Sequence, residues 1–209
     1  MNKINKLVFC LLLAGTSSVY AQKTGPSIAI YGSFAGAEVE GSGSAGTKTG
    51  SGTVGMITPI AGFDIGYNFT PAIALGVTYI PMKADIGTGK VDSTSSRSVE
   101  VKDHYTIYIE PSYVVNKDAS LYARAFYAAA STSSTGFTSK PDDLEGYGGA
   151  VGLKTFLNAN TFVRAEASYT EYDKISFTSV TTSGGASTTT TGSGTPRIVQ
   201  GTIAIGYQF

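Results

Sequence analysis

Hydrophobic and polar residues alternate along most of the chain, in segments rich in Ile, Val, Tyr, Phe and Gly. Alternation with a period of two is typical of β-strands whose two faces meet different surroundings, and helical periodicity is almost absent. The pattern predicts eight strands, at residues 26–40, 54–69, 73–85, 101–113, 120–130, 147–157, 161–177 and 198–209. The sequence therefore predicts an all-β fold.

The connections between these segments are alternately short and long. Three short ones, at 70–72, 114–119 and 158–160, contain the Pro, Asn and Asp residues of tight turns. Four long ones consist mainly of Gly, Ser, Thr and scattered charges, and lie at 41–53, 86–100, 131–146 and 178–197. Tight turns at one end and long loops at the other are typical of outer-membrane barrels. We therefore expect an eight-stranded antiparallel up-and-down transmembrane β-barrel with four long extracellular loops.

The two faces of the strands differ in character. In the second strand Phe63 and Ile65 share one face, while Asp64 and Gly66 share the other. A soluble lipocalin-like barrel would turn the apolar face inward, whereas a membrane barrel would turn it outward. The polar faces consist mostly of Gly, Ala, Ser and Thr with few charges, which suits the interior of a narrow barrel better than a wet surface. This composition favours the membrane barrel.

Aromatic residues on the apolar faces gather toward the strand ends. They include Tyr67, Phe69, Tyr113, Tyr207 and Phe209. Tyr and Phe at such positions are typical of the aromatic girdles at the two membrane interfaces. We expect these five residues to contact the lipid interface.

The first 21 residues have the features of a secretory signal peptide. Lys3 and Lys6 precede an apolar run at 7–15, and Val19-Tyr20-Ala21 has the small-x-small spacing of a cleavage site. We expect cleavage after Ala21 and a single mature domain at 22–209. The one cysteine, Cys10, would leave with the leader, so disulfides cannot hold the mature domain together.

Charge argues against two classes of protein. The chain has 15 basic and 15 acidic residues, so removal of Lys3 and Lys6 leaves a net charge of about −2. That balance does not suit nucleic-acid binding. Charged residues make up 14% of the chain, below the roughly 25–35% typical of a surface that water covers on all sides.

Three stretches carry a resemblance to a known family: Leu121-Tyr122-Ala123-Arg124-Ala125, the segment 162–169, and the C-terminal 202–209. The chain resembles the small outer-membrane barrels of the OmpA, OmpX and opacity-protein type. The resemblance implies an integral protein of the bacterial outer membrane, with outer-membrane lipid and lipopolysaccharide as its surroundings. It also implies a C-terminal signal for the barrel assembly machinery, which Thr202, Tyr207 and Phe209 match, although Ala204 stands where that signal has glycine.

Six charged residues fall on the faces predicted to point inward. They are Asp64, Glu110, Arg124, Lys154, Arg164 and Glu166. Charges in such an interior are expected in pairs, because an unpaired buried charge is costly. We expect Glu110 and Arg124 to lie at similar heights across one hairpin, and Lys154 and Glu166 to lie across from or diagonal to each other on another. In the resembled family such charges form a polar plug or gate, but in a narrow barrel they also simply fill the interior, and we favour filling.

The sequence marks no catalytic site, cofactor or metal site. His104 is the sole histidine, and some small outer-membrane barrels are lipid A-modifying enzymes that use a histidine with a serine or an acid. A nucleophile needs a base and an orienting group in mutual reach, and no such set stands out. We therefore expect a protein without enzymatic activity.

Three functions remain open on the sequence. The first is structural or adhesive: the barrel would present its four long loops to host molecules, other cells or phage. The second is a narrow gated pore for small solutes, suggested by the interior charges. The third and weakest is the lipid A-modifying enzyme based on His104.

Overall fold

The computed structural model describes residues 23–45, 48–90, 96–135, 141–183 and 186–209. The predicted leader at 1–21 and Cys10 lie outside these ranges. The described residues form ten strands: β1 (Gly25–Ala45), β2 (Lys48–Thr70), β3 (Ile73–Ile80), β4 (Ala84–Lys90), β5 (Ser96–Val114), β6 (Ala119–Thr135), β7 (Leu144–Phe156), β8 (Thr161–Tyr172), β9 (Ile175–Ser183) and β10 (Ala186–Gln208). None of the described residues belongs to a helix long and apolar enough to cross a membrane.

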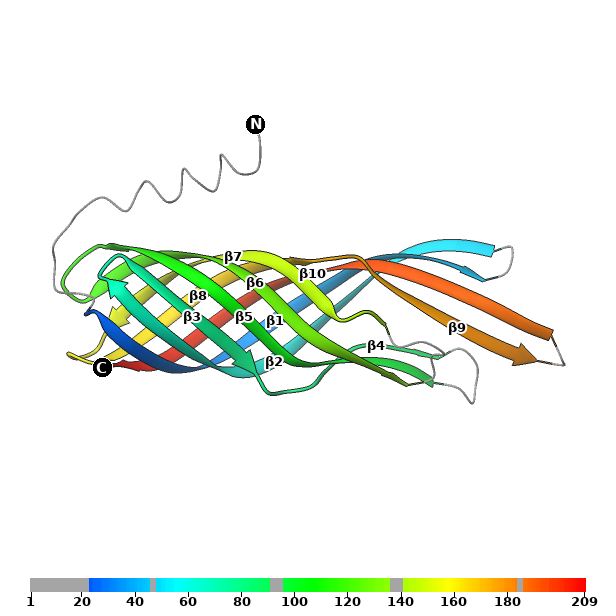
Figure 1. Ribbon diagram of the computed structural model, residues 1–209, viewed down its shortest axis with the longest axis horizontal. Coiled ribbons are helices and arrows are strands. Elements are labelled where there is room, and N and C mark those ends of the chain that lie inside the picture. The colour runs from blue at the N-terminus through cyan, green and yellow to red at the C-terminus, as the bar shows by residue number, and fades with distance from the viewer. Residues whose placement is uncertain (1–22, 46–47, 91–95, 136–140, 184–185) are drawn as a thin grey trace, which may run out of the picture.

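Eight of the strands form a closed ring. The hydrogen-bonded order is β1–β2–β3–β5–β6–β7–β8–β10, and β10 pairs with β1 to complete it. Every pairing in the ring is antiparallel. Figure 1 shows these strands wound steeply around one long axis. The predicted eight-stranded antiparallel barrel is confirmed.

The apolar faces of the ring point outward, as the sequence predicts. Phe63, Ile65 and Ile205 are 47%, 61% and 48% exposed, whereas Asp64 and Arg164 are 3% and 4% exposed. A soluble barrel would show the reverse arrangement. The outer surface of the ring is therefore an apolar belt, and the interior is polar.

The tight turns form one end of the barrel, which we call the turn end. Asn116 Oδ1 accepts hydrogen bonds from the backbone N–H groups of Asp118 and Ala119, each at 2.9 Å. Asn158 Oδ1 repeats this contact with the N–H groups of Asn160 and Thr161. An asparagine side chain that binds backbone two residues on stabilises a tight turn, which explains why Asn marked these positions.

Large interior rings lie against glycines of neighbouring strands. A Cβ atom added to Gly76 would meet the Tyr108 hydroxyl at 2.3 Å and the backbone oxygen of Ile65 at 2.7 Å. The same close approach places Tyr31 on Gly62, Tyr122 on Gly152, Phe126 on Gly148 and Phe162 on Gly206. These glycines are required because only a residue without a side chain leaves room for the ring.

The four long connections were predicted as loops, and this prediction is wrong for most of 41–53 and 178–197. Gly41 to Ala45 pairs with both β2 and β10, and β9 pairs with the first part of β10. Parts of 86–100 and 131–146 likewise belong to β4, β5, β6 and β7. Gly, Ser and Thr in these segments are typical of loops. The strands of the barrel nevertheless continue through them with the same register, so their backbone hydrogen bonds extend beyond the ring.

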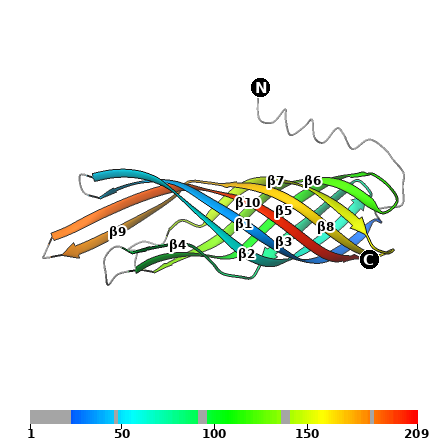
Figure 2. The same ribbon diagram turned by 180° about the vertical axis from the view of Figure 1, so that it is seen from behind.

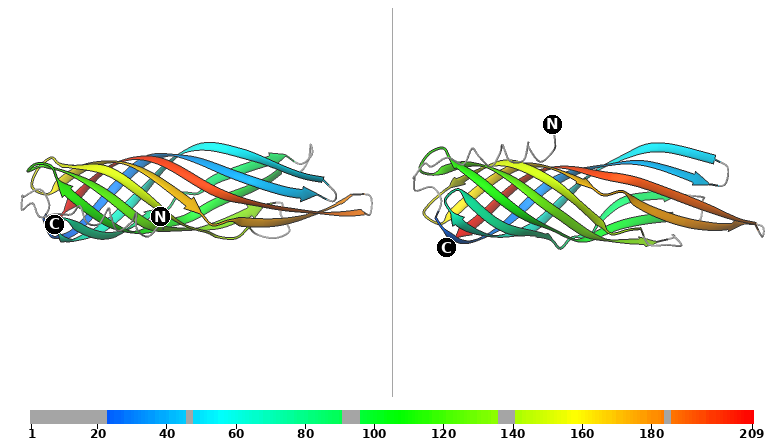
Figure 3. Two further views of the ribbon diagram at one scale, coloured as in Figure 1. Left: turned by 90° about the horizontal axis from the view of Figure 1, so that it is seen from above. Right: turned by 45° about the horizontal axis from the view of Figure 1, so that its top comes forward.

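Beyond the ring the strands separate into two sheets, at what we call the open end. One sheet has the order β2–β1–β10–β9, and the other joins β4, β5 and β6. Figures 2 and 3 show the strands β1, β2, β9 and β10, and separately β4 and β5, extending past the barrel. Two predicted strands are each divided here: 73–85 ends as β3 before Pro81, and 161–177 breaks at Asp173 and Lys174 between β8 and β9.

Candidate functional site

The six interior charges predicted from the sequence meet in one ion-pair network inside the barrel. Arg124 lies at its centre: its Nη1 is 3.1 Å from Asp64 Oδ2, its Nη2 is 2.7 Å from Glu110 Oε2, and its Nε is 3.4 Å from Glu166 Oε2. The side chains of five members are at most 4% exposed, and that of Glu166 is 10% exposed. We call this set the charge network.

The two other cations complete the network. Arg164 Nη2 donates to Asp64 Oδ2 at 2.6 Å. Lys154 Nζ is 3.7 Å from Glu110 Oε1. Lys154 and Glu166 are diagonal neighbours, as expected, because Lys154 is opposite Arg164 and Glu166 is opposite Gly152. The carboxylate that Lys154 pairs with is nevertheless that of Glu110. Lys154 therefore pairs with an acid on β5, which is not a neighbouring strand. The position of Lys154 within its own hairpin does not predict this contact.

Tyrosine hydroxyls add hydrogen bonds to two of the carboxylates. Tyr108 donates to Asp64 Oδ1 at 2.7 Å, and Tyr122 donates to Glu166 Oε2 at 2.9 Å. The Arg124 guanidinium also lies 3.8 Å from the centre of the Tyr108 ring. Three acids and three bases balance, and each charge has a partner, which is the condition under which burying ions is tolerable. The network fills the interior in the half of the barrel nearer the turn end.

A pocket lies on the open-end side of the charge network. Its volume is about 130 Å³, and Tyr108, Arg124, Arg164 and Glu166 form its floor. Its walls are mainly apolar and include Val39, Met56, Ile60, Ile80, Val101, Phe126, Leu144 and Ile198. An apolar cavity of about 150 Å³ in another protein holds benzene. This pocket is therefore of a size to hold a molecule with one aromatic ring.

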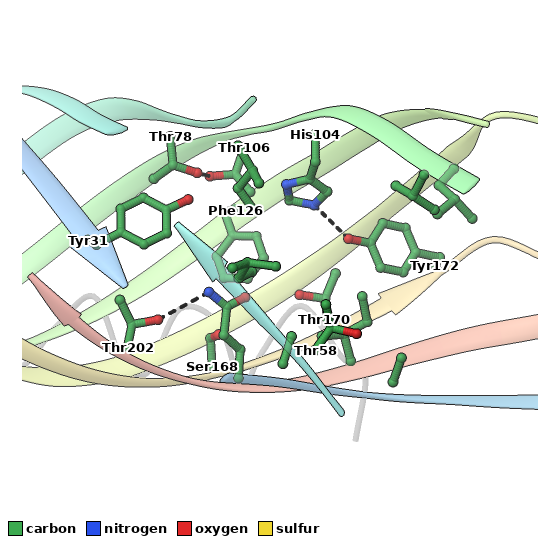
Figure 4. A pocket seen from close by; sticks show the side chains of 18 of the residues that line it. Tyr31, Thr58, Thr78, His104, Thr106, Phe126, Ser168, Thr170, Tyr172 and Thr202 are labelled. Atoms are coloured by element: carbon green, nitrogen blue, oxygen red, sulfur yellow. Dashed lines mark hydrogen bonds between the residues drawn. The ribbon is translucent and has the colours of Figure 1, made fainter. Parts of the chain in front are cut away.

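Hydroxyl and amide groups occupy defined places in the pocket. Thr78 and Thr106 hydroxyls are 2.6 Å apart, and Gln200 Nε2 donates to Thr202 Oγ1 at 3.1 Å (Figure 4). His104 Nε2 is 2.7 Å from the Tyr172 hydroxyl. The sequence singled out His104 but not Tyr172, which lies 68 residues away and on another strand. Only the pairing of the strands around the ring brings the two together.

The five aromatic residues predicted at the lipid interface are exposed on the outside near the turn end. Tyr67 and Phe69 have ring centres 4.9 Å apart, and Tyr207 and Phe209 have theirs 5.0 Å apart. A second group, missed by the sequence prediction, lies outside the barrel toward the open end and includes Tyr79, Tyr105, Tyr147 and Tyr169. The strand register places tyrosines of neighbouring strands opposite each other, which the sequence alone does not show: Tyr79 is opposite Tyr105, and Tyr127 is opposite Tyr147.

Thr202, Tyr207 and Phe209, the residues of the predicted assembly signal, lie on β10 or directly after it. Thr202 points inward and is 7% exposed, while Tyr207 and Phe209 point outward. Among the residues that the structure describes, no three His, Cys, Asp or Glu side chains are grouped so as to hold a metal ion.

Comparisons with known proteins agree with this architecture. Residues 7–195 match the family described as outer membrane protein beta-barrel domain. The structure is similar to that of outer membrane protein OprG from Pseudomonas aeruginosa, with a TM-score of 0.67, 17% identity, and coverage of 92% of this chain and 99% of that one. It is also similar to outer membrane protein AlkL in lipid bilayers, with a TM-score of 0.52, 17% identity, and coverage of 93% and 95%. No curated protein sequence gives a match.

Proposed function

The chain belongs to the outer membrane protein β-barrel domain family, and we propose that it binds a small, mainly apolar molecule in the pocket on the open-end side of its charge network. The protein is integral to the bacterial outer membrane. The apolar belt of the ring therefore faces lipid, and the open end is assigned to the cell exterior.

The observation that carries this proposal is the contrast between the two halves of the interior. Toward the turn end, ionic side chains fill the barrel; toward the open end, apolar side chains surround an unfilled pocket. Ligand pockets are typically concave and apolar with a few fixed polar groups. A barrel that served only as an anchor would have no need of an apolar cavity on its open side.

The proposal is tested with a fluorinated hydrocarbon, 4-fluoro-α-methylstyrene, titrated against the protein in lipid nanodiscs and followed by ¹⁹F NMR, with empty nanodiscs as the reference for lipid partitioning. Saturable binding is expected. Ala35 lines the pocket, so Ala35→Phe is expected to weaken binding at least tenfold. Ala61→Phe is the matched control, since Ala61 faces outward, and should bind as the wild type does. Binding that is absent, or equally retained in both variants, would refute the proposal.

A second candidate, surface adhesion, is favoured by the extended sheet β2–β1–β10–β9. Its outer part is rich in Ser, Thr and Gly, and Gly41 to Ala45 has strand partners on both sides. Such an ordered surface could bind host molecules or other cells. Excision of residues 42–51 is expected to abolish adherence of bacteria that carry the protein to host cells. Unchanged adherence would exclude this sheet as the adhesive surface.

The two other functions have weaker support. A narrow pore would have to pass the charge network, whose members are all paired and, apart from Glu166, all buried. A lipid A-modifying enzyme would need an acid or a serine on His104, and the partner that the structure gives this ring is the Tyr172 hydroxyl. We therefore propose a role without catalysis.

A further inference from the structure

His104 follows an irregularity in β5. Lys102 is opposite Ser131 and Tyr105 is opposite Ala129, so β5 has one residue more than β6 over this interval. Asp103, inside the interval, has φ of 53°, in the left-handed region that a residue with a side chain seldom adopts. Its carboxylate accepts a hydrogen bond from the Tyr79 hydroxyl at 3.2 Å. These features define a β-bulge.

The bulge changes which residues of β5 face the interior. Val101 and His104 both line the pocket although they are three positions apart, whereas regular alternation would turn one of them outward. Bulges often re-aim a side chain next to a functional site, and a strained residue persists only where its surroundings hold it. The bulge therefore places an imidazole in a pocket whose walls are mainly apolar.

The hydrogen bonding of His104 is incomplete. Nε2 is bonded to the Tyr172 hydroxyl, and Nδ1 is buried without a partner among the residues that the structure describes. If Tyr172 accepted the bond, its own buried hydroxyl proton would also need a partner. If Tyr172 donates to Nε2, the neutral ring carries its proton on Nδ1, and this single N–H remains unsatisfied. The second arrangement leaves fewer unpaired groups, so we assign Nδ1 as a donor.

An unpaired buried donor is costly, and a ligand that supplies an acceptor removes that cost. Figure 4 shows the His104 ring between Thr106 and Tyr172, with its second nitrogen on the side away from Tyr172. We infer that His104 is a specificity-determining residue, which selects ligands with an apolar body of about one aromatic ring and a single hydrogen-bond acceptor such as a carbonyl. This inference rests on the proposed function, and it names the chemical class of the ligand.

The test compares two probes of almost equal shape in the same nanodisc titration. In 4-fluoroacetophenone a carbonyl oxygen replaces the CH₂ group of 4-fluoro-α-methylstyrene, so the two differ chiefly in the acceptor. After correction for partitioning into empty nanodiscs, the ketone is expected to bind the wild type about tenfold more tightly than the alkene, as one hydrogen bond to an otherwise unsatisfied donor would give.

Two variants identify the donor. His104→Leu removes it and is expected to reduce the ratio of ketone to alkene affinity about tenfold while alkene affinity stays within about twofold. His104→Asn retains an N–H group close to the position of Nδ1 and is expected to preserve most of the ratio. The heat-dependent gel mobility of each variant confirms that the barrel is folded.

The outcomes separate this inference from the function on which it rests. If neither probe binds the wild type, both are overturned. If both probes bind with equal affinity, or if His104→Leu leaves the ratio unchanged, the pocket binds apolar molecules but His104 does not select them. If His104→Asn loses the preference as His104→Leu does, the donor assigned to Nδ1 is wrong.

Discussion

At the residue scale, Arg124 is the cation of the charge network with the most ionic partners, and Glu110 is the acid with the most: each has three. The Arg124 guanidinium contacts three carboxylates and a tyrosine ring, and its side chain is 3% exposed. Removing one partner from a buried network leaves uncompensated charge, which costs far more than the pair contributed. Stability therefore depends on the balance of the whole set rather than on any single bond.

Arg124→Met is expected to lower the free energy of unfolding by about 3–5 kcal/mol, because Asp64, Glu110 and Glu166 all lose a cation. The control is Arg197→Met, which breaks an exposed pair with Glu40 at 3.0 Å and is expected to cost less than about 1 kcal/mol. Urea titration in detergent, followed by the gel mobility of unboiled samples, measures both. Equal effects for the two arginines would contradict the argument.

Gly76→Ala tests the close approach of ring and backbone. The new methyl group would meet both the Tyr108 hydroxyl and the Ile65 carbonyl oxygen below 3 Å, and the carbonyl cannot move without disturbing the ladder. We expect a loss of about 1–3 kcal/mol by the same urea titration. Gly32→Ala is the control, since nothing in the described part of the chain lies within 4 Å of its added Cβ, and it should leave the midpoint unchanged. A stable Gly76→Ala protein would show that the interior can absorb the methyl group.

At the scale of the elements, the strands of the ring and their extensions have different roles. Ring strands pair on both sides along the apolar belt, which is necessary because unpaired backbone in lipid costs several kcal/mol per group. The extensions continue the same ladders beyond the belt, where water can satisfy an unpaired edge. The open end can therefore change length without breaking the ring.

Excision of residues 42–51, with Gly41 joined to Gly52 by Asn-Gly, is expected to leave a folded barrel. Gly41 and Gly52 are opposite each other, so a two-residue turn of this type can connect them. The excised protein should keep its heat-dependent change of gel mobility and its membrane fraction. Loss of both would mean that the extension is needed for the ring to close.

At the scale of the molecule, the protein is a barrel filled toward one end and hollow toward the other. The charge network occupies the interior near the turn end, and the pocket lies on its open-end side. An eight-stranded ring leaves space only for side chains where these are large. The interior is therefore suited to holding a ligand rather than to conducting ions along its axis.

We expect no steady conductance when the protein is reconstituted in planar lipid bilayers, and none after Glu110→Gln or Lys154→Met. Each substitution removes a charge but leaves a side chain of similar size in the interior. A known porin in the same bilayers serves as the positive control. Discrete conductance steps in the wild type, altered by either substitution, would instead support the narrow pore.

The sequence by itself determined the ring, its orientation and the identity of its buried charges. Alternation such as that of Phe63, Asp64 and Ile65 is a local property with a period of two, so a single strand already shows which residues share a face. The turns could also be predicted, because Asn116 and Asn158 accept hydrogen bonds from backbone N–H groups only two residues away.

Only the tertiary structure decided which residues meet across the ring. The contact of Lys154 with Glu110, the bond of His104 to Tyr172 and the pairing of the Ser, Thr and Gly segments all depend on register between strands far apart in the chain. Register follows from closing the ring and from bulges such as that at Asp103, which no local pattern encodes. The pocket is a property of that closure, since its walls come from strands all around the barrel.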